Sequence, residues 1–480
     1  MWPLPAAVLI LASIPAAHPH KHHRHRRQQQ GASPSLISSA WFAGWHATDF
    51  PLTNVSWEKY THMNYAFAVT TPKPDLISLA PPDQELLPKF VSAAHKNGVK
   101  AGLSIGGWTG SQFFSPSVGS SKNRTAFVQA VTDLVEQYSL DAIDFDWEFP
   151  ALPGIGCNVF NANDTSNFLS FLKELRSSPI GRHLILTAAV YTKPFADNTG
   201  QPSNDLAGFS QVLDHITIMN YDTKSTPTTG AGPNAPLEDS CAPSASQSGS
   251  ARSALNSWTA AGIPAHQILL GVPSYGHSFV IPSSVALSGQ DNLTLGLYPP
   301  YVSNNTQKGD RWDGDAGTDV CGNPVGPGGV YTLWGLIEEG FLNTDGTVRQ
   351  GIDYRYDNCS QTPFLYDQSK QVFVSYDNAM SFAAKGNFVN VTGMAGFAMW
   401  EAGGDDKNML LDSIISAAHD GDPSRFASPS NAGNSAPITQ ASGASKLRSH
   451  GMLDLIVATA ASLLARHSHA VNLDVFFLRP

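Results

Sequence analysis

The stretch DAIDFDWE, residues 141–148, decides how the rest of the chain is interpreted. In a β-strand, alternate side chains share one face. Asp144, Asp146 and Glu148 are therefore expected to point together, and the aromatic residues that alternate with them, through Phe149, to point the other way. The pattern predicts a strand with one acidic face and one apolar face.

Three carboxyl groups in register repel one another when ionised and are costly to bury, so a purely structural core would not select them. Crowding keeps a proton in the group at neutral pH and raises the pKa of at least one acid, which can then donate a proton. A Mg²⁺ or Ca²⁺ site and a solvated loop are the alternatives. The aromatic alternation disfavours the loop, and the lack of a Gly turn or EF-hand spacing disfavours the cation. The stretch therefore favours acid catalysis without metal or cofactor.

Strand-like and helix-like segments alternate on both sides of this stretch. Eight short apolar runs predict strands at residues 39–46, 62–69, 99–108, 140–150, 184–191, 216–221, 268–275 and 394–400. Helical periodicity falls between most of them, as at Phe127–Val135 and Phe168–Leu175. Eight such repeats predict an α/β fold, a (β/α)8 TIM barrel, with chemistry at the carboxyl ends of the strands. An open doubly wound sheet is the competing architecture, but no Gly-rich phosphate turn follows the first run.

More than 100 residues separate the seventh and eighth runs, too many for one helix and its loops. We interpret residues 278–365 as a small α+β insertion between strand 7 and strand 8. The barrel then comprises residues 35–277 and 366–420.

Charge and composition exclude several classes of protein. The 480 residues include 29 Lys and Arg against 39 Asp and Glu, and 29 − 39 gives a net charge of −10. A chain this acidic is not a nucleic-acid binder that relies on a basic surface. With 42% hydrophobic residues and a mean hydropathy of −0.15, it is neither a disordered tail nor a polytopic membrane protein. We expect a folded monomer without stable membrane association.

The two ends of the chain have compositions unlike the middle. Residues 1–17 are typical of a signal peptide. Residues 18–34 are rich in His and Arg, and we interpret them as a disordered pro-segment, with metal binding as the alternative. Residues 421–480 combine a Ser/Ala/Asn-rich linker with a weakly apolar tail, which Arg466 interrupts. A lipid-anchor signal ends in an unbroken apolar tail, so anchoring at the cell surface is the minor alternative to secretion.

Sequons and cysteines also indicate an extracellular protein. Seven candidate glycosylation sites occur, at Asn54, Asn123, Asn163, Asn292, Asn304, Asn358 and Asn390. The four cysteines are even in number and show no CxxC spacing, so two disulfides are expected. Four cysteines allow three pairings, and we favour Cys157 with Cys241, between two loops at the barrel mouth, and Cys321 with Cys359, within the insertion.

Several motifs in order resemble glycoside hydrolase family 18, the chitinases and related endo-β-N-acetylglucosaminidases. DAIDFDWE is similar to the family's DxxDxDxE signature, residues 104–107 (SIGG) to its SxGG, and residues 219–222 (MNYD) to its MxYD. Trp400 ends the eighth predicted strand, as the family's tryptophan does. The resemblance covers residues 38–415. His277 departs from it, because many members carry Arg there, and this puts sugar contacts near the seventh strand in doubt.

The resemblance implies a retaining, substrate-assisted hydrolysis of β-1,4-linked N-acetylglucosamine, the exception to the two-carboxylate scheme. Glu148 acts as general acid and base, Asp146 orients the substrate acetamide, and Asp144 shares its proton. Tyr221 donates a hydrogen bond to the acetamide oxygen, and Asp222 contacts the same sugar. The substrate's acetamide replaces a protein nucleophile.

A sugar also needs a flat apolar platform with polar groups at its rim. The expected substrate-binding residues are Trp400, Trp108, Trp45, Phe67, Gly107 and Met219. Core packing is the alternative role for each aromatic residue, and is nearly as well supported for Phe67. The expected partner is chitin or its oligosaccharides. Three alternatives stay open: an enzyme that acts on N-glycans, a chitin-binding lectin without turnover, and a wall protein anchored by its tail.

Overall fold

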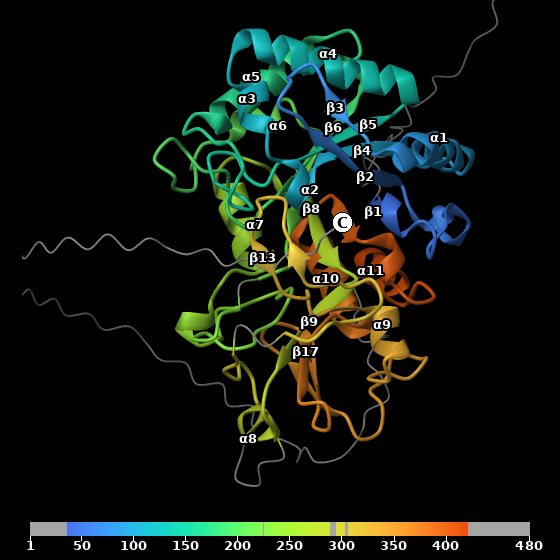
Figure 1. Ribbon diagram of the computed structural model, residues 1–480, viewed down its shortest axis with the longest axis vertical. Helices are drawn as coiled ribbons and strands as arrows, with labels where there is room; N and C mark the ends of the chain where they lie inside the picture. The colour runs from blue at the N-terminus through green and yellow to red at the C-terminus, as the bar shows by residue number, and fades with distance from the viewer. Residues whose placement is uncertain (1–35, 224, 289–293, 303–305, 421–480) are drawn as a thin grey trace, which may run out of the picture. The chain divides into compact units, whose positions relative to one another are not determined.

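The computed structural model describes residues 36–223, 225–288, 294–302 and 306–420 (Figure 1). The expected signal peptide, pro-segment and C-terminal tail lie outside these residues, as do the sequons at Asn292 and Asn304. Within the described residues, no helix is both long and apolar enough to cross a membrane.

A closed barrel of eight parallel strands forms the main part of the described chain. The strands follow one another in the order β1, β18, β8, β7, β6, β5, β4, β2, and β1 also pairs with β2, which closes the sheet. The strands are β1 (Ile37–Ala43), β2 (His62–Thr70), β4 (Lys100–Gly106), β5 (Ala142–Asp146), β6 (Ile185–Val190), β7 (His215–Met219), β8 (Ile268–Pro273) and β18 (Gly396–Trp400). The eight predicted strands are thus confirmed, and the open doubly wound alternative is wrong.

Helices surround the barrel, and several of them begin at a side chain that caps them. The Ser120 hydroxyl accepts from the Asn123 N–H at the start of α4, and Ser250 with Ser253 forms a capping box on α7. The helices of the barrel part are α1 (Pro81–Lys96), α2 (Gly107–Gly110), α3 (Phe114–Val118), α4 (Ser121–Tyr138), α5 (Asp164–Ser177), α6 (Ala207–Ser210), α7 (Ala251–Ala260), α10 (Ala379–Thr392) and α11 (Met409–Asp420). A two-residue strand, β3 (Ile77–Ser78), pairs antiparallel with β2.

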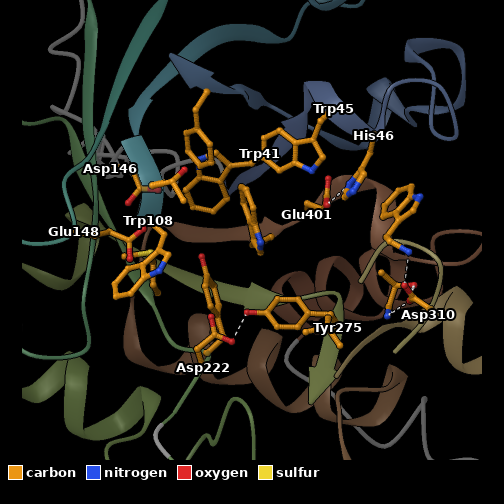
Figure 2. A pocket seen from close by; sticks show the side chains of 18 residues that line it. Trp41, Trp45, His46, Trp108, Asp146, Glu148, Asp222, Tyr275, Asp310 and Glu401 are labelled. Carbon is orange, nitrogen blue, oxygen red and sulfur yellow. Dashed lines mark hydrogen bonds and ion pairs between the residues drawn. The ribbon is translucent and has the colours of Figure 1, made fainter. Parts of the chain in front are cut away.

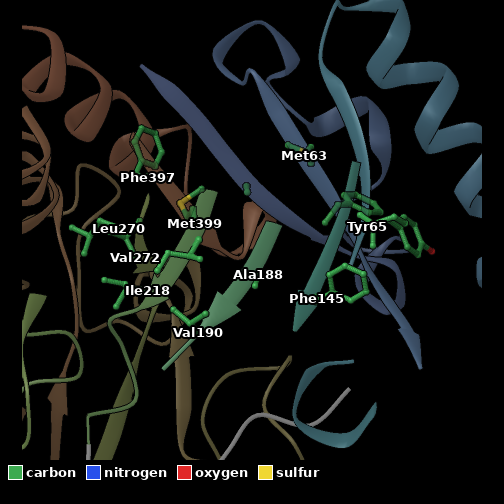
Figure 3. Packing of buried hydrophobic residues seen from close by; sticks show 14 of the residues in the cluster. Met63, Tyr65, Phe145, Ala188, Val190, Ile218, Leu270, Val272, Phe397 and Met399 are labelled. Carbon is green, nitrogen blue, oxygen red and sulfur yellow. The ribbon is translucent and has the colours of Figure 1, made fainter. Parts of the chain in front are cut away.

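The apolar face of β5 packs outward against these helices. Phe145 meets Phe171 of α5 with ring centroids 5.4 Å apart, and Phe171 meets Phe127 of α4 at 4.9 Å. Other fully buried strand residues, such as Ile218 and Phe397, continue the same core around the barrel (Figure 3). Because the aromatic face is buried outward, the acidic face of β5 points into the barrel.

The chain between β8 and β18 forms a five-stranded antiparallel sheet in the order β14-β9-β17-β16-β15. Its strands are β9 (Tyr275–Val280), β14 (Val330–Thr332), β15 (Asp353–Asp357), β16 (Thr362–Asp367) and β17 (Val372–Ser375). The same segment holds β10 (Leu287–Ser288), β11 (Thr294–Leu295), β12 (Gly317–Thr318), β13 (Pro324–Val325), α8 (Ser283–Ala286) and α9 (Leu333–Glu338). The sheet extends beyond residues 278–365 at both ends. Its first strand, β9, begins at Tyr275, and β17, which pairs with β9, ends at Ser375.

Both disulfides join this insertion to the barrel, and the expected pairing is wrong. Cys157 bonds to Cys321 and Cys241 bonds to Cys359, with Cα atoms 5.5 and 6.1 Å apart. Cys321 lies in the β12–β13 turn, beside the loop that follows β5. Cys359 lies between β15 and β16, beside the loop that follows β7. Pairing follows the loops that meet in space, and the order of cysteines along the chain does not reveal this.

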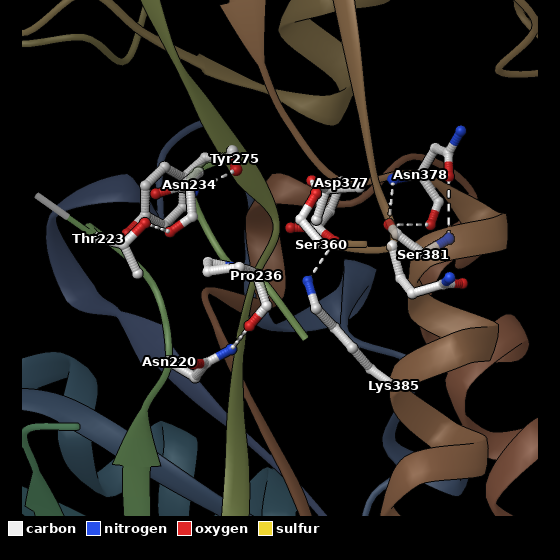
Figure 4. A network of polar contacts seen from close by, with 12 residues as sticks. Asn220, Thr223, Asn234, Pro236, Tyr275, Ser360, Asp377, Asn378, Ser381 and Lys385 are labelled. Carbon is white, nitrogen blue, oxygen red and sulfur yellow. Dashed lines mark hydrogen bonds and ion pairs between the residues drawn. The ribbon is translucent and has the colours of Figure 1, made fainter. Parts of the chain in front are cut away.

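A buried ion pair joins α10 to the residues that follow β17, the last strand of the insertion sheet (Figure 4). Lys385 contacts Asp377, and their side chains are 0% and 1% exposed. Burial lowers the pKa of Lys385 and raises that of Asp377, while their mutual attraction opposes both shifts. Each charge therefore depends on the other to remain ionised inside the protein.

Replacing Lys385 by Met is expected to lower the free energy of unfolding by about 3–5 kcal/mol, because it leaves Asp377 buried without its partner. Urea unfolding measures the change. The double variant Lys385→Met/Asp377→Leu removes both charges and should recover most of the loss. A single-variant loss below about 1 kcal/mol, the size of an exposed pair, would contradict this account.

Candidate active site

A cleft opens at the carboxyl ends of the barrel strands, where the fold predicts chemistry (Figure 2). Its lining combines barrel residues with residues of the insertion. The lining residues are Trp41, Trp45, His46, Phe67, Trp108, Thr109, Asp146, Glu148, Met219, Tyr221, Asp222, Tyr275, Asp310, Trp312, Val330, Thr332, Trp400 and Glu401.

Asp144 lies beneath this cleft inside the barrel and is held by donors from three other barrel strands, β1, β4 and β6. It accepts hydrogen bonds from Trp41 Nε1 at 3.2 Å, Ser104 Oγ at 2.7 Å and Thr187 Oγ1 at 2.6 Å. Burial raises the pKa of Asp144, and the three donors oppose that shift because they favour the carboxylate. Sequence analysis missed the role of Trp41 and Thr187, which lie on strands far from β5 in the sequence.

Asp146 and Glu148 lie above Asp144 and line the cleft. Burial raises the pKa of Asp146 well above its usual range, and the nearby Asp144 raises it further. The Oδ1 atom of Asp146 is buried and accepts no hydrogen bond from the described residues. It is therefore positioned to accept one from a ligand in the cleft.

Glu148 is the last of the three acids along the chain and lies just beyond the carboxyl end of β5 at Asp146. Burial raises its pKa well above the usual range, and Asp146 and Asp222 raise it further. Its backbone is held in place, since its N–H donates to Ser111 Oγ at 3.0 Å and its carbonyl accepts from Asn158 Nδ2 at 2.8 Å. The raised pKa favours the protonated form of the side chain, the form in which a general acid donates.

Tyr221 and Asp222 face these acids from the end of β7. Burial raises the pKa of Tyr221 well above its usual range, so its hydroxyl stays protonated and can donate. Asp222 Oδ1 accepts from the Tyr275 hydroxyl at 2.7 Å and lies 2.7 Å from His277 Nε2. The residue that departs from the family pattern, His277, thus contacts Asp222.

Aromatic side chains form the floor of the cleft. The floor lies between the acids of β5, Asp146 and Glu148, and the residues after β7, Tyr221 and Asp222. Trp400 stacks on Phe67 at 5.5 Å and meets Trp41 and Trp45 at 5.9 and 6.2 Å. Phe67 thus lines the cleft and also packs against the Trp45 and Trp400 rings, and its contact with a sugar stays a prediction. A Cβ atom on Gly107 would lie 3.0 Å from the Phe67 ring, so the glycine leaves room for that ring.

Two residues of the expected platform stand elsewhere along the cleft. Trp108 lies beside Glu148 (Figure 2), and Met219 lines the wall that carries Tyr221. Gly106, beside Gly107 in the sequence, has a positive φ of 114°, and a Cβ there would lie 2.2 Å from the Asp146 carbonyl oxygen. A small residue is therefore needed for the close approach of β4 to β5.

Comparison with known proteins assigns this barrel to a family. Residues 38–405 match the family model described as glycosyl hydrolases family 18. The chain belongs to glycoside hydrolase family 18. A chitinase-like effector of Moniliophthora roreri is 45% identical over 86% of this chain and 97% of its own length. A crystal structure of a chitinase from Rhizomucor miehei superposes with a TM-score of 0.70, at 34% identity over 79% of this chain and 99% of that one.

This family 18 cleft contains residues that sequence analysis missed, at the end away from Glu148 (Figure 2). His46 Nδ1 lies 2.8 Å from Glu401 Oε1, and the His46 ring stacks on Trp312 of the insertion with centroids 3.8 Å apart. Asp310 accepts from the Thr332 hydroxyl at 2.6 Å. Of these residues, only Glu401 could have been placed at the cleft from the sequence, because it directly follows Trp400. No periodic pattern marks Trp312 or Asp310 in the insertion.

The acids of the cleft do not resemble a cation site. Among the residues that the structure describes, no group of three or more His, Cys, Asp or Glu side chains is arranged to hold a metal ion. The three acids instead follow one another along β5 and its loop, from Asp144 inside the barrel to Glu148 in the cleft. Hydroxyl and indole groups donate hydrogen bonds to Asp144.

Proposed function

We propose that this family 18 member is a chitinase, which hydrolyses β-1,4 linkages between N-acetylglucosamine units with retention at the anomeric carbon. The observation that carries the proposal is the cleft itself, in which Asp146, Glu148 and Tyr221 converge above the Trp400 floor. Family membership and the chitinases among the relatives support the same substrate class.

In the first step, Glu148 donates its proton to the glycosidic oxygen. The carbonyl oxygen of the substrate's own 2-acetamido group attacks the anomeric carbon, and the bond to the leaving sugar breaks. That sugar departs with the proton as an alcohol, and an oxazolinium ion remains. Because the nucleophile is part of the sugar, its effective concentration is high.

In the second step, the Glu148 carboxylate takes a proton from water, and the hydroxide oxygen adds to the anomeric carbon. The bond to the acetamide oxygen breaks, and the acetamide re-forms with retained configuration. Glu148 is again a carboxylic acid, so the cycle is closed. One residue serves as acid and then as base at the same position.

Asp146 and Tyr221 act on the acetamide between these steps. Asp146 accepts from the acetamide N–H and stabilises the positive charge of the oxazolinium ion, while the Tyr221 hydroxyl donates to the acetamide oxygen. Asp144 below them affects the charge of Asp146 by its own negative charge. Preorganised groups of this kind stabilise charge without rearranging during the reaction.

Replacing Tyr221 by Phe is expected to lower kcat on chitohexaose by about ten- to a hundredfold, because one donor to the acetamide is lost while the ring remains. Initial rates of product formation measure the change. Tyr138→Phe, on α4, serves as the control and should retain the wild-type rate. An unchanged rate for Tyr221→Phe would contradict the role of its hydroxyl.

The rate is expected to fall as pH rises, because Glu148 works in its protonated form and its pKa is raised. Removing the charge of Asp222 lowers the Glu148 pKa, since Asp222 contributes to the raise. The alkaline limb of the kcat/KM profile should therefore move to lower pH in Asp222→Asn, whatever the rate at its maximum. A limb that stays in place or moves to higher pH would contradict this coupling.

A chitin-binding protein without turnover is the second candidate, because the relative of 45% identity is called a chitinase-like effector. Release of reducing ends from colloidal chitin by wild type but not by Glu148→Gln supports the enzyme. Equal inactivity of both proteins with retained chitin binding supports the lectin. Release of N-glycans from a glycoprotein, with no action on chitin, would support the endo-β-N-acetylglucosaminidase.

We also propose that the protein is secreted and glycosylated. Two disulfides favour an oxidising compartment. Among the described sequons, Asn54, Asn163, Asn358 and Asn390 are exposed, whereas the Asn123 amide donates to the Pro116 carbonyl at 2.8 Å. Recovery of the protein from culture medium, with a mass that falls after deglycosylation, tests both points.

A further inference from the structure

A hairpin of the insertion begins and ends at the cleft. We call residues 313–328, which include β12 and β13, the strap (Figure 1). Trp312 precedes it and Val330 follows it closely, and both line the cleft. Asp313 Oδ2 closes its base by accepting from the Gly309 and Gly329 N–H groups at 2.7 and 2.9 Å. The strap thus rises from the wall of the cleft that the insertion supplies.

The tip of the strap is bonded to the loop that follows β5. Cys321 forms the disulfide with Cys157, in the loop between β5 and α5. The next residue, Asn158, donates to the Glu148 carbonyl at 2.8 Å, so the attachment lies beside the proposed acid. Because β5 is the fourth barrel strand and the insertion follows the seventh, the strap joins two sides of the barrel mouth.

Between its two attachments the strap is rigid and exposed. Asp319 Oδ1 accepts from the N–H groups of Cys321 and Asn323 at 2.9 and 2.8 Å, which fixes the turn. A Cβ atom on Gly322 or Gly326 would meet nothing within 4 Å, and Val320 is 54% exposed. The hairpin is therefore an exposed element with a hydrogen-bonded turn and does not lie in the core.

We propose that the Cys157–Cys321 bond holds the strap across the cleft on the Glu148 side, so that a polymer is bound by threading an end beneath it. The inference rests on the proposed function for its substrate, a linear chain of N-acetylglucosamine. A threaded chain cannot leave sideways, so it dissociates slowly and is cut repeatedly near its end. Opening the strap converts the site into a groove that accepts the middle of a chain.

The double variant Cys157→Ser/Cys321→Ser tests this proposal on soluble glycol chitin, with viscosity and reducing ends followed together. Wild type should lower the viscosity little for each reducing end released, and the variant should lower it several-fold more. Cys241→Ser/Cys359→Ser is the matched control, because it also removes a bond between the insertion and the barrel, but at the loop after β7 and outside the strap. Equal viscosity loss per reducing end in wild type and the Cys157 variant would overturn the proposal, as would an equal rise in the control.

A binding measurement separates this proposal from the proposed function. In the Glu148→Gln background, the dissociation rate of chitohexaose, followed by tryptophan fluorescence, should rise about tenfold when the Cys157–Cys321 bond is removed. An unchanged dissociation rate would overturn the strap even if wild type hydrolyses chitin. If the double serine variant does not fold, deletion of residues 317–325 together with Cys157→Ser removes the strap above its closed base. The same two outcomes then apply.

Discussion

Replacing Glu148 by Gln is expected to lower the rate of chitin hydrolysis by about two to four orders of magnitude, the usual contribution of a general acid and base. Gln has nearly the same shape but cannot donate a proton to the glycosidic oxygen or take one from water. The side chain lies in a buried position that raises its pKa, so its loss affects the one group in the cleft placed for both transfers.

Initial rates on chitohexaose measure this loss, and binding of the same oligosaccharide should persist because the Trp400 floor is unchanged. Glu136→Gln, an exposed residue of α4, is the matched control and should retain the wild-type rate. A Glu148→Gln enzyme within about tenfold of wild type would end the proposed mechanism, since proton transfer alone is worth more.

Replacing Asp146 by Asn is expected to lower kcat by about two to three orders of magnitude, similar to the loss of one group that stabilises transition-state charge. The variant cannot carry the negative charge that the proposed mechanism places beside the oxazolinium ion. One of its two carboxylate oxygens also becomes an NH₂ group, which cannot accept from the acetamide N–H, whereas the buried Asp146 Oδ1, unpartnered among the described residues, can. The fold should persist, because burial makes a neutral side chain at this position less costly than a carboxylate.

Asp141→Asn is the matched control, since Asp141 begins the same acidic stretch but points away from the cleft. Its carboxylate binds the Ala101 N–H at 2.9 Å and lies 2.8 Å from His95. The control is expected to lose stability through those contacts and to retain kcat, whereas Asp146→Asn should show the reverse. Comparable kcat for the two variants would remove acetamide participation from the mechanism.

The acidic strand and the barrel could be predicted because they depend on local pattern. Alternation of side chains is a property of any strand, so Asp144 and Asp146 were placed inward from the sequence alone. The pattern failed at Phe149, which lies beyond the end of β5 at Asp146. Its ring packs on Tyr191 at 5.3 Å and joins the apolar group around the cleft floor.

Contacts between distant segments could not be predicted. His46 and Trp312 are far apart in the sequence. Their rings stack because a loop of the insertion contacts the loop that follows β1. The cysteine pairing failed for the same reason, because the expected Cys321–Cys359 bond assumed that the insertion closes on itself. Neither contact leaves a periodic signal that a single sequence can show.

The two disulfides have a consequence for how the chain matures. Their sequence separations are 164 and 118 residues, and each joins a loop of the barrel to a turn of the insertion. Neither sulfur pair can meet until both parts have acquired structure and come together, so oxidation is expected late in biogenesis. The covalent state of a newly made molecule therefore reports its assembly: a fully oxidised chain has already docked its two halves, and free thiols identify one that has not.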